Sequence, residues 1–224
     1  MKEEFWPENV AEAEEVQRYL KEKIKITPLK SEPELIAAAD AAFSGDVVFS
    51  AASLYRLRGL THLQDVFSES KAGFDYMPGL LAFREGKALI DAIRRLGISP
   101  DLILIDGHGI AHPKGIGIAS HIGVILNIPT LGCAKSRLVG EYQEPGPAKG
   151  EWSYLFYRGL KVGVVLRTKT DVQPVFVSPG HLVDIESSVE IVMKCVKDYR
   201  IPEPLRTADR LSKEMKRDYE AGLS

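Results

Sequence analysis

The segment LILIDGHGIAHPKGIGIASHIG at 102–123 carries the residue types best suited to chemistry. A four-residue apolar run leads into the carboxylate of Asp106, a loop with four glycines follows, and three of the chain's five histidines lie in the same segment. A short apolar run bounded by turn residues is typical of a buried strand, which places Asp106 at a strand end. Because a bare buried carboxylate is very costly, we expect Asp106 to have a cationic partner, a metal ion or a proton.

Three further carboxylates could join Asp106. Asp40 lies in the apolar run at 35–43, Glu85 in the first turns of a helical pattern, and Asp209 near the C-terminus. If the strands of Asp40 and Asp106 are neighbours, their spacing of about 4.8 Å brings both carboxylates within reach of one cation. Oxygen-only ligation suits Mg²⁺ or Mn²⁺ rather than zinc, and Mg²⁺ held in this way commonly activates water and stabilises a leaving oxygen on phosphate.

Taken one at a time, these acids have simpler interpretations. A strand-end aspartate such as Asp40 more often caps a turn than binds a metal. Glu85 alone is interpreted as a solvated helix residue, and Asp209 alone as an ion-pair partner of Arg206 or Arg210. Spacing alone therefore leaves a shared metal site open.

Lys135 and the histidines also have two interpretations each. Lys135 follows the short apolar run at 130–134, where it would bind a phosphate, stabilise transition-state charge or simply be solvated. His108 and His112 have the spacing of a helical zinc pair, but Pro113 and the nearby glycines argue against a helix. Neither a G-x-S-x-G elbow nor a P-loop occurs.

Composition favours one α/β domain over residues 1–224, because strand-like and helix-like runs alternate in a chain that is 45% hydrophobic. The net charge of −2 gives no global basic field. The basic run from Arg206 to Arg217 is either a local phosphate-binding track or a solvated helix face.

Two cysteines are too few for a disulfide framework, and Cys133 lies in an apolar run that suggests a core position. The sequence shows no signal segment or membrane span, so we expect a cytoplasmic protein.

The elements that must position these residues follow from periodicity. We expect helices over 8–25, 80–97, 117–127, 184–198 and 203–220. We expect strands over 35–43, 46–58, 61–70, 102–106, 130–134, 152–158, 161–168 and 174–178. The first three strands form a meander with a turn near Arg58 and Gly59. The result is a mixed sheet with helices on its faces and a ligand site at the ends of its parallel strands.

Five blocks of the sequence, in one order, resemble the endonuclease V family of nucleases that act at deaminated purines. The blocks are DYMPGLLAFREG at 75–86, DGHGIAHPKGIGIASHIG at 106–123, IPTLGCAKSRLVG at 128–140, VSPGHLVDIESS at 177–188 and RIPEPLRTAD at 200–209. The resemblance covers most of the chain from about residue 25 onward. It implies a ribonuclease H-like fold, with three antiparallel strands and further parallel strands flanked by helices.

The resemblance also implies roles for the acids and the lysine. Asp40, Glu85 and Asp106 correspond to the catalytic acids, with Asp40 and Asp106 as the Mg²⁺ or Mn²⁺ ligands, and Lys135 corresponds to the active-site lysine. Asp209 matches a catalytic position where many bacterial members carry histidine. This departure keeps an oxygen that can bind a metal but removes a group that titrates near neutrality.

The family's PYIP wedge corresponds here to Asp75, Tyr76, Met77 and Pro78, so its first proline is replaced. Apolar side chains beside a rigid proline can enter a base stack and fill the gap that an extruded nucleotide leaves. The pocket for that base would be lined by small groups together with His112. The matching positions are Gly79, Leu81, Gly107, Ile118, Gly132 and Ala134. Backbone N–H donors there would favour the carbonyl of hypoxanthine over the amino group of adenine.

The resemblance therefore implies a monomeric, Mg²⁺-dependent DNA repair endonuclease. It would nick a strand at the second phosphodiester bond on the 3′ side of deoxyinosine, in duplex or single-stranded DNA. Two alternatives stay open: an endoribonuclease for inosine-containing RNA, and a non-catalytic module that binds the lesion.

Overall fold

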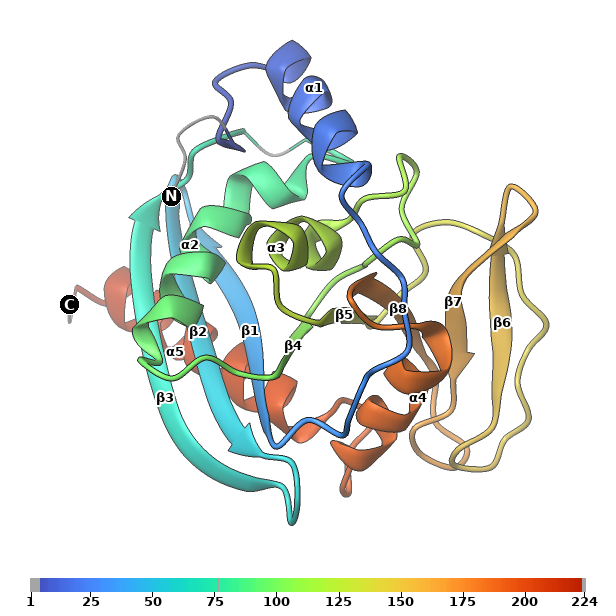
Figure 1. Ribbon diagram of the computed structural model, residues 1–224. Coiled ribbons are helices and arrows are strands. Elements are labelled where there is room, and N and C mark those ends of the chain that lie inside the picture. The colour runs from blue at the N-terminus through green and yellow to red at the C-terminus, as the bar shows by residue number, and fades with distance from the viewer. Residues whose placement is uncertain (1–4, 76, 223–224) are drawn as a thin grey trace.

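Eight strands form one mixed sheet in the order β3-β2-β1-β4-β5-β8-β7-β6 (Figure 1). The structure is a computed structural model and describes residues 5–75 and 77–222. The strands are β1 (Leu35–Ser44), β2 (Val47–Arg56), β3 (Thr61–Lys71), β4 (Leu102–Ile105), β5 (Thr130–Ala134), β6 (Trp152–Tyr157), β7 (Leu160–Leu166) and β8 (Val175–His181). The helices are α1 (Val10–Lys21), α2 (Leu81–Arg95), α3 (Ile118–Leu126), α4 (Ile185–Lys194) and α5 (Glu203–Glu220).

The strand directions confirm the predicted ribonuclease H-like sheet. Strands β1, β2 and β3 form an antiparallel meander. The β2–β3 turn contains Gly59 at φ +77°, a conformation that glycine adopts without strain. Strand β4 pairs in parallel with both β1 and β5, and the remaining pairs are antiparallel. Only these central parallel strands bring carboxyl ends to one edge, which is where the sequence places its ligand site.

Helices cover both faces of the sheet. Figure 1 shows α2 and α3 in front of it and α5 behind it. Helices α2 and α3 pack on one set of alternating strand residues, which includes Ala39 and Ile105. Residues of α4 and α5 pack with the opposite set, which includes Ala38 and Leu104. Because side chains alternate along a strand, Asp40 and Asp106 continue the set that faces α5.

Two predicted helices are shorter than expected. The first was predicted over 8–25, but α1 ends at Lys21. The chain from there runs extended to the end of β8, where the Lys25 N–H donates to His181 and the Lys25 carbonyl accepts from Leu182 N–H. These partners replace helical hydrogen bonds. Helix α4 similarly ends at Lys194 rather than at 198, since the Cys195 carbonyl accepts from Glu203 N–H and leads the chain into α5.

The two cysteines are buried and unpaired, as expected for Cys133. Across residues 5–75 and 77–222, no helix has both the length and the apolar character that crossing a bilayer requires.

Candidate active site

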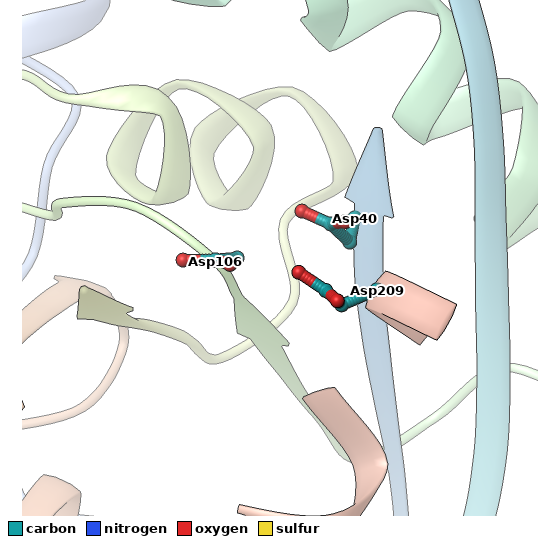
Figure 2. A group of neighbouring side chains, drawn as sticks. All are labelled: Asp40, Asp106 and Asp209. Atoms are coloured by element: carbon teal, nitrogen blue, oxygen red, sulfur yellow. The ribbon is translucent and has the colours of Figure 1, made fainter. Parts of the chain in front are cut away.

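Strand register brings the two predicted metal ligands together. Ala39 of β1 pairs with Ile105 of β4, so the next residues, Asp40 and Asp106, lie side by side. Strand β4 ends at Ile105 while β1 continues to Ser44, and Asp209 approaches from α5 (Figure 2). One carboxylate oxygen from each of these aspartates lies within 4.8 Å of the other two. Figure 2 shows Asp40 on β1, Asp106 at the end of β4 and Asp209 on α5, gathered at one place.

Glu85 lies close to this triad but outside the set of oxygens within 4.8 Å of one another. It projects from the second turn of α2 and is 8% exposed. Burial, followed by the charges of Asp40 and Asp106, raises the pKa of Glu85 to about 8. Glu85 therefore faces the same acids from the other side of the sheet, which excludes the interpretation as a solvated helix residue.

The crowding of negative charge also affects Asp40. Burial and then the neighbouring Asp106 raise the pKa of Asp40 to about 7, against the effect of a hydrogen bond from Ser212. That hydroxyl lies on α5, 3.0 Å from Asp40 Oδ2. Since burial and like charge both favour the protonated acid, the triad needs positive charge to hold all its carboxylates ionised.

Two lysines supply part of that charge. Lys135 Nζ lies 2.6 Å from Asp106 Oδ2 and 2.8 Å from Asp209 Oδ1. Lys213, one turn after Asp209 on α5, bonds both of its carboxylate oxygens. Partial burial by itself would raise the pKa of Asp209, but the hydrogen bonds and charges of the two lysines hold it below its usual value. The predicted interpretation of Asp209 as a partner of Arg206 or Arg210 is wrong, because those arginines pair with glutamates on α5.

The donor set fits a hard divalent cation. Every ligand it offers is a carboxylate oxygen, as Mg²⁺ and Mn²⁺ prefer. The ammonium of Lys135 bridges Asp106 and Asp209, which shows that a cation is accommodated between them. Among the described residues, this is the one group of three or more histidine, cysteine or acidic side chains close enough to share an ion. His108 and His112, whose spacing would suit zinc only on a helix, are not part of it.

The basic run at 206–217 is a helix face laced with ion pairs. All five of its basic side chains contact an acid within α5 or next to it. The pairs are Arg206–Glu203, Arg210–Glu214, Lys213–Asp209, Lys216–Glu220 and Arg217–Glu214. The solvated-face interpretation therefore describes this helix better than a free basic track.

A cavity of about 260 Å³ is lined by Gly107, the residue that follows Asp106. Seven of the predicted substrate-binding residues line it: Met77, Pro78, Gly79, Leu81, Gly107, His112 and Ile118. Gly132 and Ala134 do not line it. Instead, Gly132 lies beneath the backbone of 107–109, where a Cβ atom would come within 2.4 Å of the Gly107 carbonyl oxygen, and Ala134 packs in a separate apolar cluster. Tyr76 lies outside the described residues, so its predicted role stays a prediction.

His112 gives the cavity a neutral hydrogen-bond donor. Its Nδ1 accepts from the Lys114 N–H, so the ring proton resides on Nε2. Burial, with smaller effects from His108 and Lys114, lowers the pKa of His112 to about 4. The ring lies against Gly79, where a Cβ atom would be 3.8 Å from Nε2. The cavity therefore presents an uncharged N–H group rather than an imidazolium at neutral pH.

Two residues, one at the cavity and one at the acidic cluster, were not predicted from the sequence. Gln17 lines the cavity and Ser212 bonds Asp40. Gln17 had one detectable signal, a polar side chain on the apolar face of a predicted helix, between Ala13 and Leu20. Ser212 had none, since nothing along the chain connects it to an acid 172 residues away.

Known proteins of one family resemble this chain over most of its length. The family model described as Endonuclease V matches residues 18–210. An Endonuclease V of Geotalea uraniireducens is 47% identical over 206 residues, which cover 92% of this chain and 88% of that protein. The family model therefore spans the site residues described above except Gln17, Ser212 and Lys213, which lie just outside its bounds.

Solved structures share the fold. The crystal structure of an Endonuclease V from Streptomyces avermitilis has a TM-score of 0.92 at 35% identity and covers 96% of each chain. A substituted Endonuclease V from Ciona intestinalis has a TM-score of 0.83 at 25% identity, covering 93% of this chain and 97% of that one. That protein was crystallised with a 23mer DNA containing an inosine followed by a ribo-adenosine.

Proposed function

The chain belongs to the endonuclease V family, and we propose that it is a divalent-metal-dependent endonuclease that nicks DNA next to deoxyinosine. One observation carries the proposal. A cluster of three aspartates and a lysine adjoins a cavity whose described lining includes no acidic side chain, and the two meet at Asp106 and Gly107. Such a juxtaposition lets one site hold a base while a neighbouring site acts on the backbone that carries it.

The cavity favours an acceptor on the purine. Hypoxanthine carries a carbonyl where adenine carries an amino group. The N-terminal N–H groups of Leu81 and Ala82 in α2 have no hydrogen-bond acceptor among the described residues, and the helix has no side-chain cap. Both residues line the cavity, as does the His112 imidazole. Donors of this kind suit the carbonyl of hypoxanthine and leave an adenine amino group without a partner.

The acids and the lysine divide the chemistry. Asp40 and Asp106 would hold Mg²⁺ or Mn²⁺ with Asp209 as a third oxygen donor. When bound, such an ion activates water and offsets charge on the phosphate. Glu85 would orient the attacking water from the α2 side. Lys135, once the carboxylates beside it are neutralised, has an ammonium available for a phosphate oxygen.

The wedge at residues 75–78 would keep the extruded base out of the DNA duplex. Met77 is 37% exposed at the rim of the cavity, beside Pro78. With Tyr76, they would fill the space that the extruded nucleotide leaves. By resemblance to the family, we place the cut at the second phosphodiester bond on the 3′ side of the lesion.

The experiment uses an end-labelled duplex with a single deoxyinosine and a matched duplex with deoxyadenosine. We expect purified protein with Mg²⁺ to give one nicked product from the first duplex only, and none when a chelator replaces Mg²⁺. Equal cutting of both duplexes would contradict the proposed specificity. Cutting that survives chelation would contradict the proposed metal dependence.

Inosine-containing RNA is a second candidate substrate. The related Ciona intestinalis protein was crystallised with a ribo-adenosine after the inosine, so a ribose next to the lesion is compatible with binding in that protein. Matched DNA, RNA and mixed strands, compared by kcat/KM, decide between the two. A non-catalytic binding module is disfavoured, because all four acids and Lys135 are present. Titration calorimetry with Mg²⁺ tests this alternative, since such a module would release no heat of metal binding.

A further inference from the structure

Helix α1 lies against both loops that wall the cavity. Its buried face, with Ala13, packs in an apolar cluster with Leu80 and Phe83 at the start of α2. Its Glu14 forms an ion pair with Lys114 in the loop that follows His112. Figure 1 shows α1 above the N-terminal end of α2 and close to α3. The helix is thus anchored on two sides by contacts that do not involve its one buried polar side chain, Gln17.

Gln17 makes a single, directed hydrogen bond. Its Nε2 donates to the Gly79 carbonyl at 2.8 Å, across 62 residues of sequence. The side chain is only 3% exposed, and its Oε1 has no hydrogen-bond partner among the described residues. Replacing the amide by an apolar side chain of the same shape would remove one hydrogen bond and one buried unpaired oxygen together, which are opposing effects on stability. The more specific consequence of the amide is its hold on the Gly79 carbonyl.

Gly79 is the residue that turns the chain into α2. It has φ +82°, and the Leu80 N–H that follows donates to the Met77 carbonyl at 3.0 Å. The next two N–H groups, of Leu81 and Ala82, are the donors without an acceptor at the cavity. The orientation of the Gly79 peptide thus fixes the turn from which both donors project.

We propose that Gln17 is a positioning residue for base discrimination: by holding the Gly79 carbonyl, it keeps the N-terminal donors of α2 directed at a 6-oxo purine in the cavity. The inference rests on the proposed function and deepens it, because it assigns part of the specificity to a helix that does not carry the wedge or the acids. A free Gly79 carbonyl could rotate toward the cavity, where it would accept a hydrogen bond from the amino group of adenine.

The test compares Gln17→Met, which keeps the shape and removes both polar atoms, with Glu15→Gln on the exposed face of the same helix. Three quantities are measured for each variant and for the unaltered protein: the ratio of kcat/KM for inosine over adenosine in one strand context, the Mg²⁺ concentration for half-maximal rate, and the midpoint of thermal unfolding. The affinity for inosine and adenosine strands in the presence of a chelator gives the same ratio without catalysis.

We expect Gln17→Met to lower the inosine-to-adenosine ratio by about tenfold, the value of one directed hydrogen bond. Its Mg²⁺ requirement and unfolding midpoint should match those of the unaltered protein, and Glu15→Gln should change none of the three. If Gln17→Met lowers the midpoint and leaves the ratio intact, Gln17 is a packing residue and the inference is overturned. If the unaltered protein itself does not prefer inosine, the proposed function fails, and this inference fails with it.

Discussion

The acidic cluster and the cavity beside it are built in opposite ways. The cluster takes its aspartates from β1, from the residue after β4 and from α5, where register and helix packing fix the spacing. Burial and the neighbouring carboxylates raise the pKa of Asp40 and Glu85. The cavity takes its lining largely from loops and helix ends, no acidic side chain among the described residues lines it, and burial keeps its His112 uncharged. Under the proposed function, strands and helix α5 would carry the chemistry, and loops and helix ends would carry recognition. Changes in one region should therefore leave the other working.

The largest effect should come from Asp106, which touches both regions through the chain. Asp106→Ala removes a central oxygen donor of the proposed metal site, and we expect cleavage to fall by about a thousandfold or more. Binding to an inosine strand should persist, because the lining of the cavity is unchanged. A gel-based nicking assay measures cleavage, and fluorescence anisotropy on the same preparation measures binding. Nicking at a normal rate by a pure variant would refute the assigned role.

A Lys135 variant distinguishes two roles within the acidic cluster, stabilising phosphate charge and ordering the metal ligands. Lys135→Met removes an ammonium that lies between Asp106 and Asp209. We expect the maximal rate to drop by about a hundredfold, since phosphate charge loses its partner, while half-saturation by Mg²⁺ occurs at an equal or lower concentration. A Mg²⁺ titration of the rate separates the two quantities. A variant that needs much more Mg²⁺ would indicate that Lys135 organises the ligands rather than the phosphate.

His112 tests the cavity in the same way. His112→Phe keeps an aromatic ring against Gly79 but removes the Nε2 donor, and we expect the preference for inosine over adenosine to fall by about tenfold. Mg²⁺ dependence should not move, because no acid of the cluster contacts this ring. Competition binding with matched inosine and adenosine strands measures the preference. A changed Mg²⁺ requirement would contradict the separation of the two regions.

A smaller effect concerns stability and pH without metal. Because the folded protein raises the pKa of Asp40 to about 7 and of Glu85 to about 8, it binds protons more tightly than the unfolded chain does. Stability should therefore fall as the pH rises from about 4 through 8. Glu85→Gln removes one of these groups, so its unfolding midpoint should exceed that of the unaltered protein at pH 8.5 and approach it at pH 5. Calorimetric scans in a chelator test this, and an equal midpoint at pH 8.5 would contradict it.

How far the sequence predicts this molecule depends on whether the signal is local. Every strand and helix was placed by periodicity, and strand alternation with the parallel β1–β4 pair brought Asp40 beside Asp106 as expected. The early end of α1 was not predictable, since its backbone partners at 181–182 are distant in sequence. Ser212 and Gln17 were missed for the same reason: each acts through one hydrogen bond to a residue far along the chain.

The cavity also contains positions that the sequence predicts and positions that only the fold explains. Gly79 and Gly107 were placed by the resemblance and do line it, whereas Gly132 matches the family's pattern yet lies beneath the 107–109 backbone. A glycine in a motif can mark a ligand or a close approach of two chain segments. The sequence does not distinguish these cases, because the second segment is known only from the fold.

The central claim is that Asp40 and Asp106 share one divalent ion, and Mn²⁺ locates such an ion most directly. Crystals soaked in Mn²⁺ and measured near its absorption edge should show one strong anomalous peak about 2.2 Å from an oxygen of each aspartate. The peak should be absent from crystals of the Asp106→Ala variant. No peak at saturating Mn²⁺, or a peak that touches neither aspartate, would contradict the account.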